Sequence, residues 1–133
     1  MRLKIEYNSP VILTFTLVSC AVLGLDMLFE GFSRNYFALR GAFDFGNIVD
    51  YFRLFSHTAG HFDWGHLVGN FAFILLIGPI LEEKYGSKNL LIMILVTALI
   101  TGIINALFFS TGLMGASGIV FMMILLGSLV NVR

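Results

Sequence analysis

A serine flanked by small residues stands near the end of the sequence, in Met114-Gly115-Ala116-Ser117-Gly118, where a last apolar run begins. A helix over 117–131 would rise about 22 Å, which is less than the roughly 30 Å of a hydrocarbon core. Such a helix must begin inside the bilayer or be covered by protein, and its first N–H groups need partners there. The positive end of this helix would favour an alkoxide or an oxyanion beside Ser117. The chemistry that this position suggests is nucleophilic attack.

Two further polar residues, His66 and Asn70, have the spacing of neighbours on one face of a helix. Uncharged N–H donors at membrane depth are costly unless they face the interior of a helix bundle. Next to Ser117, two such donors would stabilise an oxyanion, a role worth about 3–4 kcal/mol for each donor. The alternative is interhelical hydrogen bonding, worth about 0.6 kcal/mol each. The helix alone favours the second interpretation, and the nearby serine favours the first.

The remaining histidines suggest a zinc site as a competing hypothesis. His57 and His61 have the i, i+4 spacing of two metal ligands, and Asp63 offers a carboxylate. The metalloprotease pattern, however, requires a glutamate directly after the first histidine, and Thr58 stands there. We therefore expect neither a metal nor a cofactor.

The composition indicates what must position these residues. Hydrophobic residues make up 58% of the 133-residue chain and charged residues 12%, which excludes an ordinary soluble domain. The formal net charge is zero, so nothing suggests a nucleic-acid partner. The single cysteine, Cys20, excludes an internal disulfide. The sequence predicts an all-α, polytopic helical bundle in a lipid bilayer.

Four apolar runs predict four transmembrane helices in a single domain. Their expected spans are about 10–29, 66–82, 89–110 and 117–131. The long connection from Glu30 to Asp63 mixes aromatic and charged residues, as is typical of the headgroup zone, and predicts short interfacial helices at 35–42 and 47–55. Basic residues near both ends of the chain and in the turn after the second run favour a cytoplasmic N-terminus.

An ordered set of motifs on this background resembles the rhomboid family of intramembrane serine proteases. The set comprises His61-x4-His66-x3-Asn70, Gly115-Ala116-Ser117-Gly118, Phe52-Arg53 in the first loop, and Glu82-x3-Gly86-Ser87 after the second span. The resemblance implies that Ser117 is the nucleophile and that His66, Asn70 and the Ser117 backbone N–H form the oxyanion hole. His61, Gly115 and Gly118 would then support the site.

One feature departs from the family. The family's core has six helices, and its general base is a histidine on the sixth, whereas no histidine follows Ser117 here. We therefore expect residues 1–133 to be the N-terminal four-helix portion of that core, incomplete at the C-terminus.

The resemblance implies an endopeptidase that cleaves transmembrane segments of other membrane proteins, in a form that lacks the C-terminal catalytic histidine. We expect a multi-pass protein of a bacterial cell membrane with a cytoplasmic N-terminus. The alternative is a non-catalytic rhomboid-like protein that binds membrane clients, or an inactive fragment.

Overall fold

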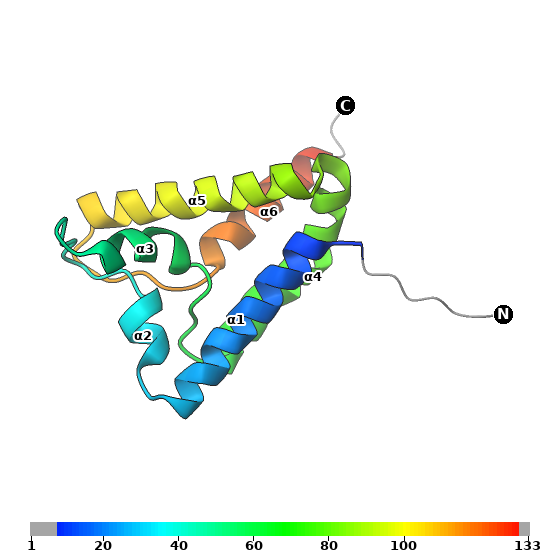
Figure 1. Cartoon of the computed structure of the whole chain (residues 1–133). Coiled ribbons are helices and arrows are strands. Elements are labelled where there is room, and N and C mark those ends of the chain that lie inside the picture. The colour runs from blue at the N-terminus through cyan, green and yellow to red at the C-terminus, as the bar shows by residue number, and fades with distance from the viewer. Residues whose placement is uncertain (1–7, 131–133) are drawn as a thin grey trace.

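The computed structural model describes residues 8–130 of the chain, and this range folds into α-helices joined by loops and one isolated β-bridge (Figure 1). The helices are α1 (Pro10–Leu28), α2 (Phe32–Phe37), α3 (Ile48–Ser56), α4 (Trp64–Tyr85), α5 (Ser87–Phe108) and α6 (Ser117–Val130). The predicted all-α class of fold is confirmed for these residues.

Three of these helices, α1, α4 and α5, are long and apolar enough to cross a membrane, with 19, 22 and 22 residues. The protein is therefore an integral membrane protein. The fourth apolar helix, α6, has 14 residues and is shorter, in keeping with the short run in the sequence. Each expected span overlaps one of these helices, and residue 131 lies outside the described residues. Helix α4 starts before the expected residue because the Asp63 carboxylate caps it, accepting the His66 N–H at 2.7 Å.

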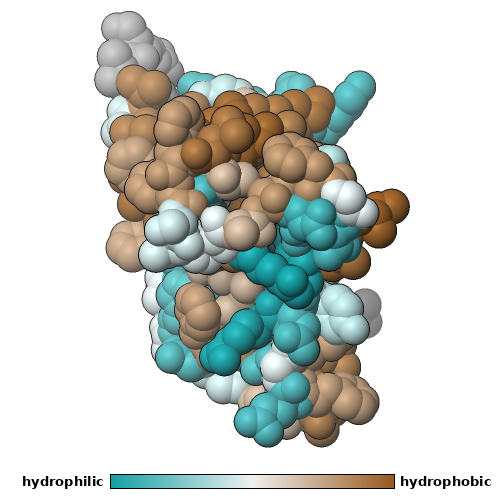
Figure 2. All heavy atoms as spheres, turned by 90° about the vertical axis from the view of Figure 1, so that its left-hand side faces the viewer, coloured by the Kyte–Doolittle hydropathy of each residue, from teal (hydrophilic) through white to brown (hydrophobic). Residues whose placement is uncertain are grey.

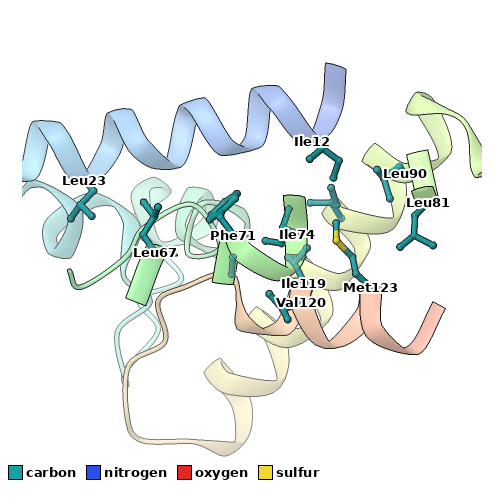
Figure 3. Close-up of a cluster of buried hydrophobic side chains, with 12 residues drawn as sticks. Ile12, Leu23, Leu67, Phe71, Ile74, Leu81, Leu90, Ile119, Val120 and Met123 are labelled. Carbon is teal, nitrogen blue, oxygen red and sulfur yellow. The ribbon is translucent and has the colours of Figure 1, made fainter. Parts of the chain in front are cut away.

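The core lies where α4 packs between α1 and α6 (Figure 3). Its fully buried side chains include Ile12 from α1, Ile74 from α4 and Ile119 from α6. Gly78 lets α1 approach closely, since a Cβ atom there would lie 2.5 Å from the Ile12 Cδ1 atom. This packing holds α6 at a fixed position against α4.

A buried carboxylate joins the start of α1 to the end of α4. Glu82, 3% exposed, accepts the Val11 and Ile12 N–H groups at 3.0 Å each, and the Ser87 hydroxyl donates to it at 2.6 Å. Ser9, the N-cap residue of α1, makes no side-chain cap of its own. Glu82 therefore caps the first turn of a helix that lies far away in the sequence.

The first loop differs in part from the prediction. An interfacial helix was expected at 35–42, but α2 ends at Phe37, because Leu39 exchanges backbone hydrogen bonds with Leu113 at 2.9 and 3.1 Å. This pairing requires an extended backbone. It also joins the first loop to the turn that precedes α6.

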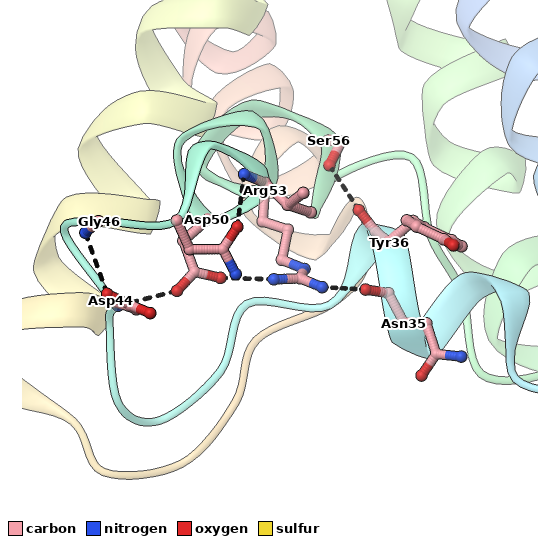
Figure 4. Close-up of polar contacts among 9 residues, drawn as sticks. Asn35, Tyr36, Asp44, Gly46, Asp50, Arg53 and Ser56 are labelled. Carbon is pink, nitrogen blue, oxygen red and sulfur yellow. Dashed lines mark hydrogen bonds and ion pairs between the residues drawn. The ribbon is translucent and has the colours of Figure 1, made fainter.

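Polar contacts fix α3 within this loop (Figure 4). The buried Arg53 guanidinium donates to the Asp50 carboxylate and to the Asn35 carbonyl, and Asp50 accepts the Asp44 N–H at 2.8 Å. Burial alone would raise the pKa of Asp50, but the Asp44 N–H and the Arg53 charge outweigh it and lower that pKa. Seen from the end that carries α2 and α3, hydrophilic residues form a band between apolar zones (Figure 2).

Candidate active site

Ser117 is the first residue of α6, and its side chain is exposed. The three residues before it, Met114, Gly115 and Ala116, are buried, so the turn is packed although the serine is accessible. Gly115 has φ +130°, a conformation that residues with a Cβ atom rarely adopt. The turn therefore projects the Ser117 side chain from a rigid, buried base.

Two histidines of the first loop hold this turn through its backbone. The Gly115 N–H donates to the His57 carbonyl at 2.7 Å, and the Ala116 N–H lies 3.3 Å from His61 Nε2. The His57 ring reaches the other way, with Nε2 2.9 Å from the Ala98 carbonyl on α5. His57 thus ties α5 to the turn.

The hydrogen bond from Ala116 determines which nitrogen of the neutral His61 ring carries the proton. Because Nε2 accepts the N–H, the proton of the neutral ring is on Nδ1. Burial, with a smaller contribution from the neighbouring His66, lowers the pKa of His61 to about 4. His61 is therefore neutral at physiological pH, which is the state that its contact with Ala116 requires. Burial also lowers the pKa of His57.

His66, in the first turn of α4, lies directly against the turn before Ser117. A Cβ atom on Gly115 would lie 2.6 Å from His66 Cε1 and 3.1 Å from Nε2, so only glycine fits there. The His66 ring also lies near the rings of His61, at 5.0 Å between centroids, and Phe62, at 5.8 Å. The close approach of α4 to the turn is made at this histidine.

Asn70 follows His66 one turn later on α4. His66 Nδ1 and Asn70 Nδ2 are buried and have no hydrogen-bond partner within residues 8–130. The Ser117 hydroxyl likewise makes no hydrogen bond to either side chain in this range. Unpaired buried polar groups are costly, and a ligand oxygen or water would satisfy them.

The structure thus brings His61, His66 and Gly115 into contact around the turn. A Cβ atom on Gly118 would meet Thr101 Cγ2 at 3.5 Å, an ordinary contact, so packing does not demand glycine at that position. From the sequence, His57 was considered only as a metal ligand, and its backbone hydrogen bond to Gly115 was missed. The i, i+4 spacing of His57 and His61 was the signal available in the sequence. In the structure, both residues bind the backbone of the turn before Ser117.

These features define a polytopic helical membrane protein with a serine at the start of a short helix and two buried, unpaired side-chain nitrogens on the neighbouring helix. Residues 49–132, more than half of the chain, match the family model described as Rhomboid domain. The chain belongs to the rhomboid family, whose members are serine proteases of the membrane.

Proposed function

We propose that this chain carries the nucleophile and the oxyanion hole of an intramembrane serine endopeptidase. The observation that carries the proposal is the pair of buried, unpaired side-chain nitrogens, His66 Nδ1 and Asn70 Nδ2, on the helix that packs against the turn before Ser117. A polar pair left without partners in the protein is suited to a charge that exists only during the reaction.

In the proposed reaction, Ser117 Oγ forms a bond to the carbonyl carbon of a peptide bond in a transmembrane segment of another membrane protein. The carbonyl oxygen becomes the oxyanion, which accepts hydrogen bonds from His66, Asn70 and the Ser117 N–H. The serine proton passes to a general base and then to the leaving amine, and water later hydrolyses the acyl-enzyme.

The general base is a group other than the three histidines of the sequence. His57 and His61 hold the backbone of the turn, and use of His66 as the base would remove an oxyanion donor.

We place the protein in a bacterial cell membrane with a cytoplasmic N-terminus.

A second candidate function is the binding of membrane clients without cleavage. The engagement of His57 and His61 with the turn favours it, because a serine without a base is a weak nucleophile. The two functions differ in whether Ser117 reacts.

Labelling by a fluorophosphonate probe in isolated membranes distinguishes these functions. With the general base present, we expect the wild type to be labelled, Ser117→Ala to lose the label, and Asn70→Ala to react about 10²-fold more slowly, as when one oxyanion donor is removed. Ser128→Ala, on the exposed surface of the same helix, is the matched control and should react as the wild type does. Equal labelling of Ser117→Ala would refute the role of Ser117, and an unlabelled wild type that still captures a transmembrane peptide would favour client binding.

A further inference from the structure

A polar cavity of about 240 Å³ lies between the end of α1, the start of α2 and the loop before α4. Its lining includes Asp26, Glu30, Ser33, Arg34, His61 and Phe62. It is smaller than the roughly 300–1,000 Å³ of pockets that enclose drug-sized ligands. We propose that this cavity binds the headgroup of a zwitterionic phospholipid, an inference that does not depend on the proposed protease activity.

The cavity carries charges of both signs. Asp26 and Glu30 supply carboxylates, and Arg34 supplies a guanidinium. One Asp26 oxygen already accepts the Ser33 N–H at 2.9 Å, which fixes the carboxylate in the wall. A headgroup with an ammonium and a phosphate matches this arrangement, because the carboxylates pair with the ammonium and the guanidinium binds the phosphate.

The cavity also lies at the level where headgroups are found. The last residues of the α1 span, Met27 and Leu28, are exposed and apolar, as lipid-facing side chains are. Phe62 and Trp64 are exposed beside them, and the Trp64 indole N–H lies 3.0 Å from the Met27 sulfur. Aromatic side chains of this kind gather at the boundary between acyl chains and headgroups. A lipid whose tails lie along the end of α1 would bring its headgroup to the cavity.

His61 stands in the wall of this cavity, and its ring also holds the turn before Ser117. His61 is fully buried, its proton is on Nδ1, and this nitrogen has no hydrogen-bond partner within the described residues. Because the other nitrogen of His61 holds Ala116, a bound headgroup would also steady the turn before Ser117.

The proposal is tested with the full chain, purified in detergent, stripped of lipid and titrated in native mass spectrometry. The two probes are phosphatidylethanolamine and phosphatidylglycerol with identical acyl chains, which differ in the ammonium. The variants are Glu30→Gln and Arg34→Gln. The matched controls are Glu83→Gln and Lys88→Gln, which remove the same charges from exposed positions at the opposite end of the spans.

We expect the wild type to bind phosphatidylethanolamine in preference to phosphatidylglycerol. Loss of one charge-assisted hydrogen bond should weaken that binding by roughly tenfold in each cavity variant and leave both controls unchanged. Equal binding of the two lipids, or equal binding by cavity variants and controls, would identify a non-specific lipid layer and overturn the proposal. A preference for phosphatidylglycerol that depends on Arg34 alone would also overturn it, because the site would then take an anion.

Discussion

Replacement of Glu82 tests whether one carboxylate joins α1 to α4. Its oxygens accept two N–H groups of the first turn of α1 and the Ser87 hydroxyl. Glu82→Ala leaves these three donors without their acceptor in a position that is almost fully buried. Glu82→Gln keeps the shape and one acceptor oxygen but loses the charge.

The expected cost lies between two limits. Hydrogen bonds to charged groups contribute about 1.5–3 kcal/mol each in soluble proteins. Hydrogen bonds between membrane helices average about 0.6 kcal/mol, because the donors find other partners after unfolding. For three bonds at the end of a span, we expect Glu82→Ala to lower the free energy of unfolding by about 3 kcal/mol and Glu82→Gln by about 1–2 kcal/mol.

The measurement is unfolding by sodium dodecyl sulfate in mixed micelles, followed by circular dichroism. Glu83→Ala, at the exposed neighbouring position, is the matched control and should change the free energy of unfolding by less than about 0.5 kcal/mol. The reasoning fails if Glu82→Ala and Glu83→Ala unfold alike, or if Glu82→Gln is the more damaging of the two changes at residue 82.

Three further predictions concern the turn and the helix contact. Gly115→Ala should destabilise the fold by about 2–3 kcal/mol and displace the His66 ring, because the new methyl group would lie 2.6 Å from that ring; histidine chemical shifts report the displacement. The free energy of unfolding should fall by about 3 kcal/mol as the pH drops from 6.5 to 4, because His61 binds a proton near pH 6.5 in the unfolded chain and only near pH 4 in the folded one. Below pH 4, the contribution of His61 should stay constant. Gly78→Ala should cost about 1–3 kcal/mol through its clash with Ile12, and Ile12→Val should recover part of this cost in a double-mutant cycle.

Each of these predictions has its own control. Gly69→Ala, on the open side of α4, has no atom within 4 Å of the added carbon and should leave the fold as stable as the wild type or slightly more stable. If it destabilises as much as Gly115→Ala or Gly78→Ala, then helix substitution in general, and not close packing, is the cause. The chain with His61→Gln should lose the part of the acid dependence that His61 contributes, while His57, whose pKa burial also lowers, keeps its own part. An unchanged pH profile would assign the whole dependence to groups other than His61.

The helices could be predicted from the sequence because membrane solvation leaves little choice. Long apolar runs in lipid must satisfy their own backbone, so α1, α4 and α5 follow from hydropathy alone. The proximity of the second span to the serine turn was suggested by the need to bury His66, and the structure places that ring against Gly115. The roles of Ser117, His66 and Asn70 in a reaction stay predictions.

The first loop was harder to predict because long-range contacts determine it. Its composition indicated interfacial helices, but the position of α2 depends on the pairing of Leu39 with Leu113, which no local pattern reveals. The burial of Glu82 against the first turn of α1 likewise depends on a distant partner that no local pattern reveals. In both cases the deciding partner lies more than sixty residues away in the chain.

The backbone pairing of Leu39 with Leu113 has a consequence for biogenesis. During synthesis, the ribosome must deliver α4 and α5 to the membrane before Leu113 exists as a partner for Leu39. The segment around Leu39 therefore has no backbone partner while the earlier spans insert. The turn that presents Ser117 can form only after Leu113 has been synthesised and has paired with Leu39. The geometry around Ser117 is therefore completed late in assembly.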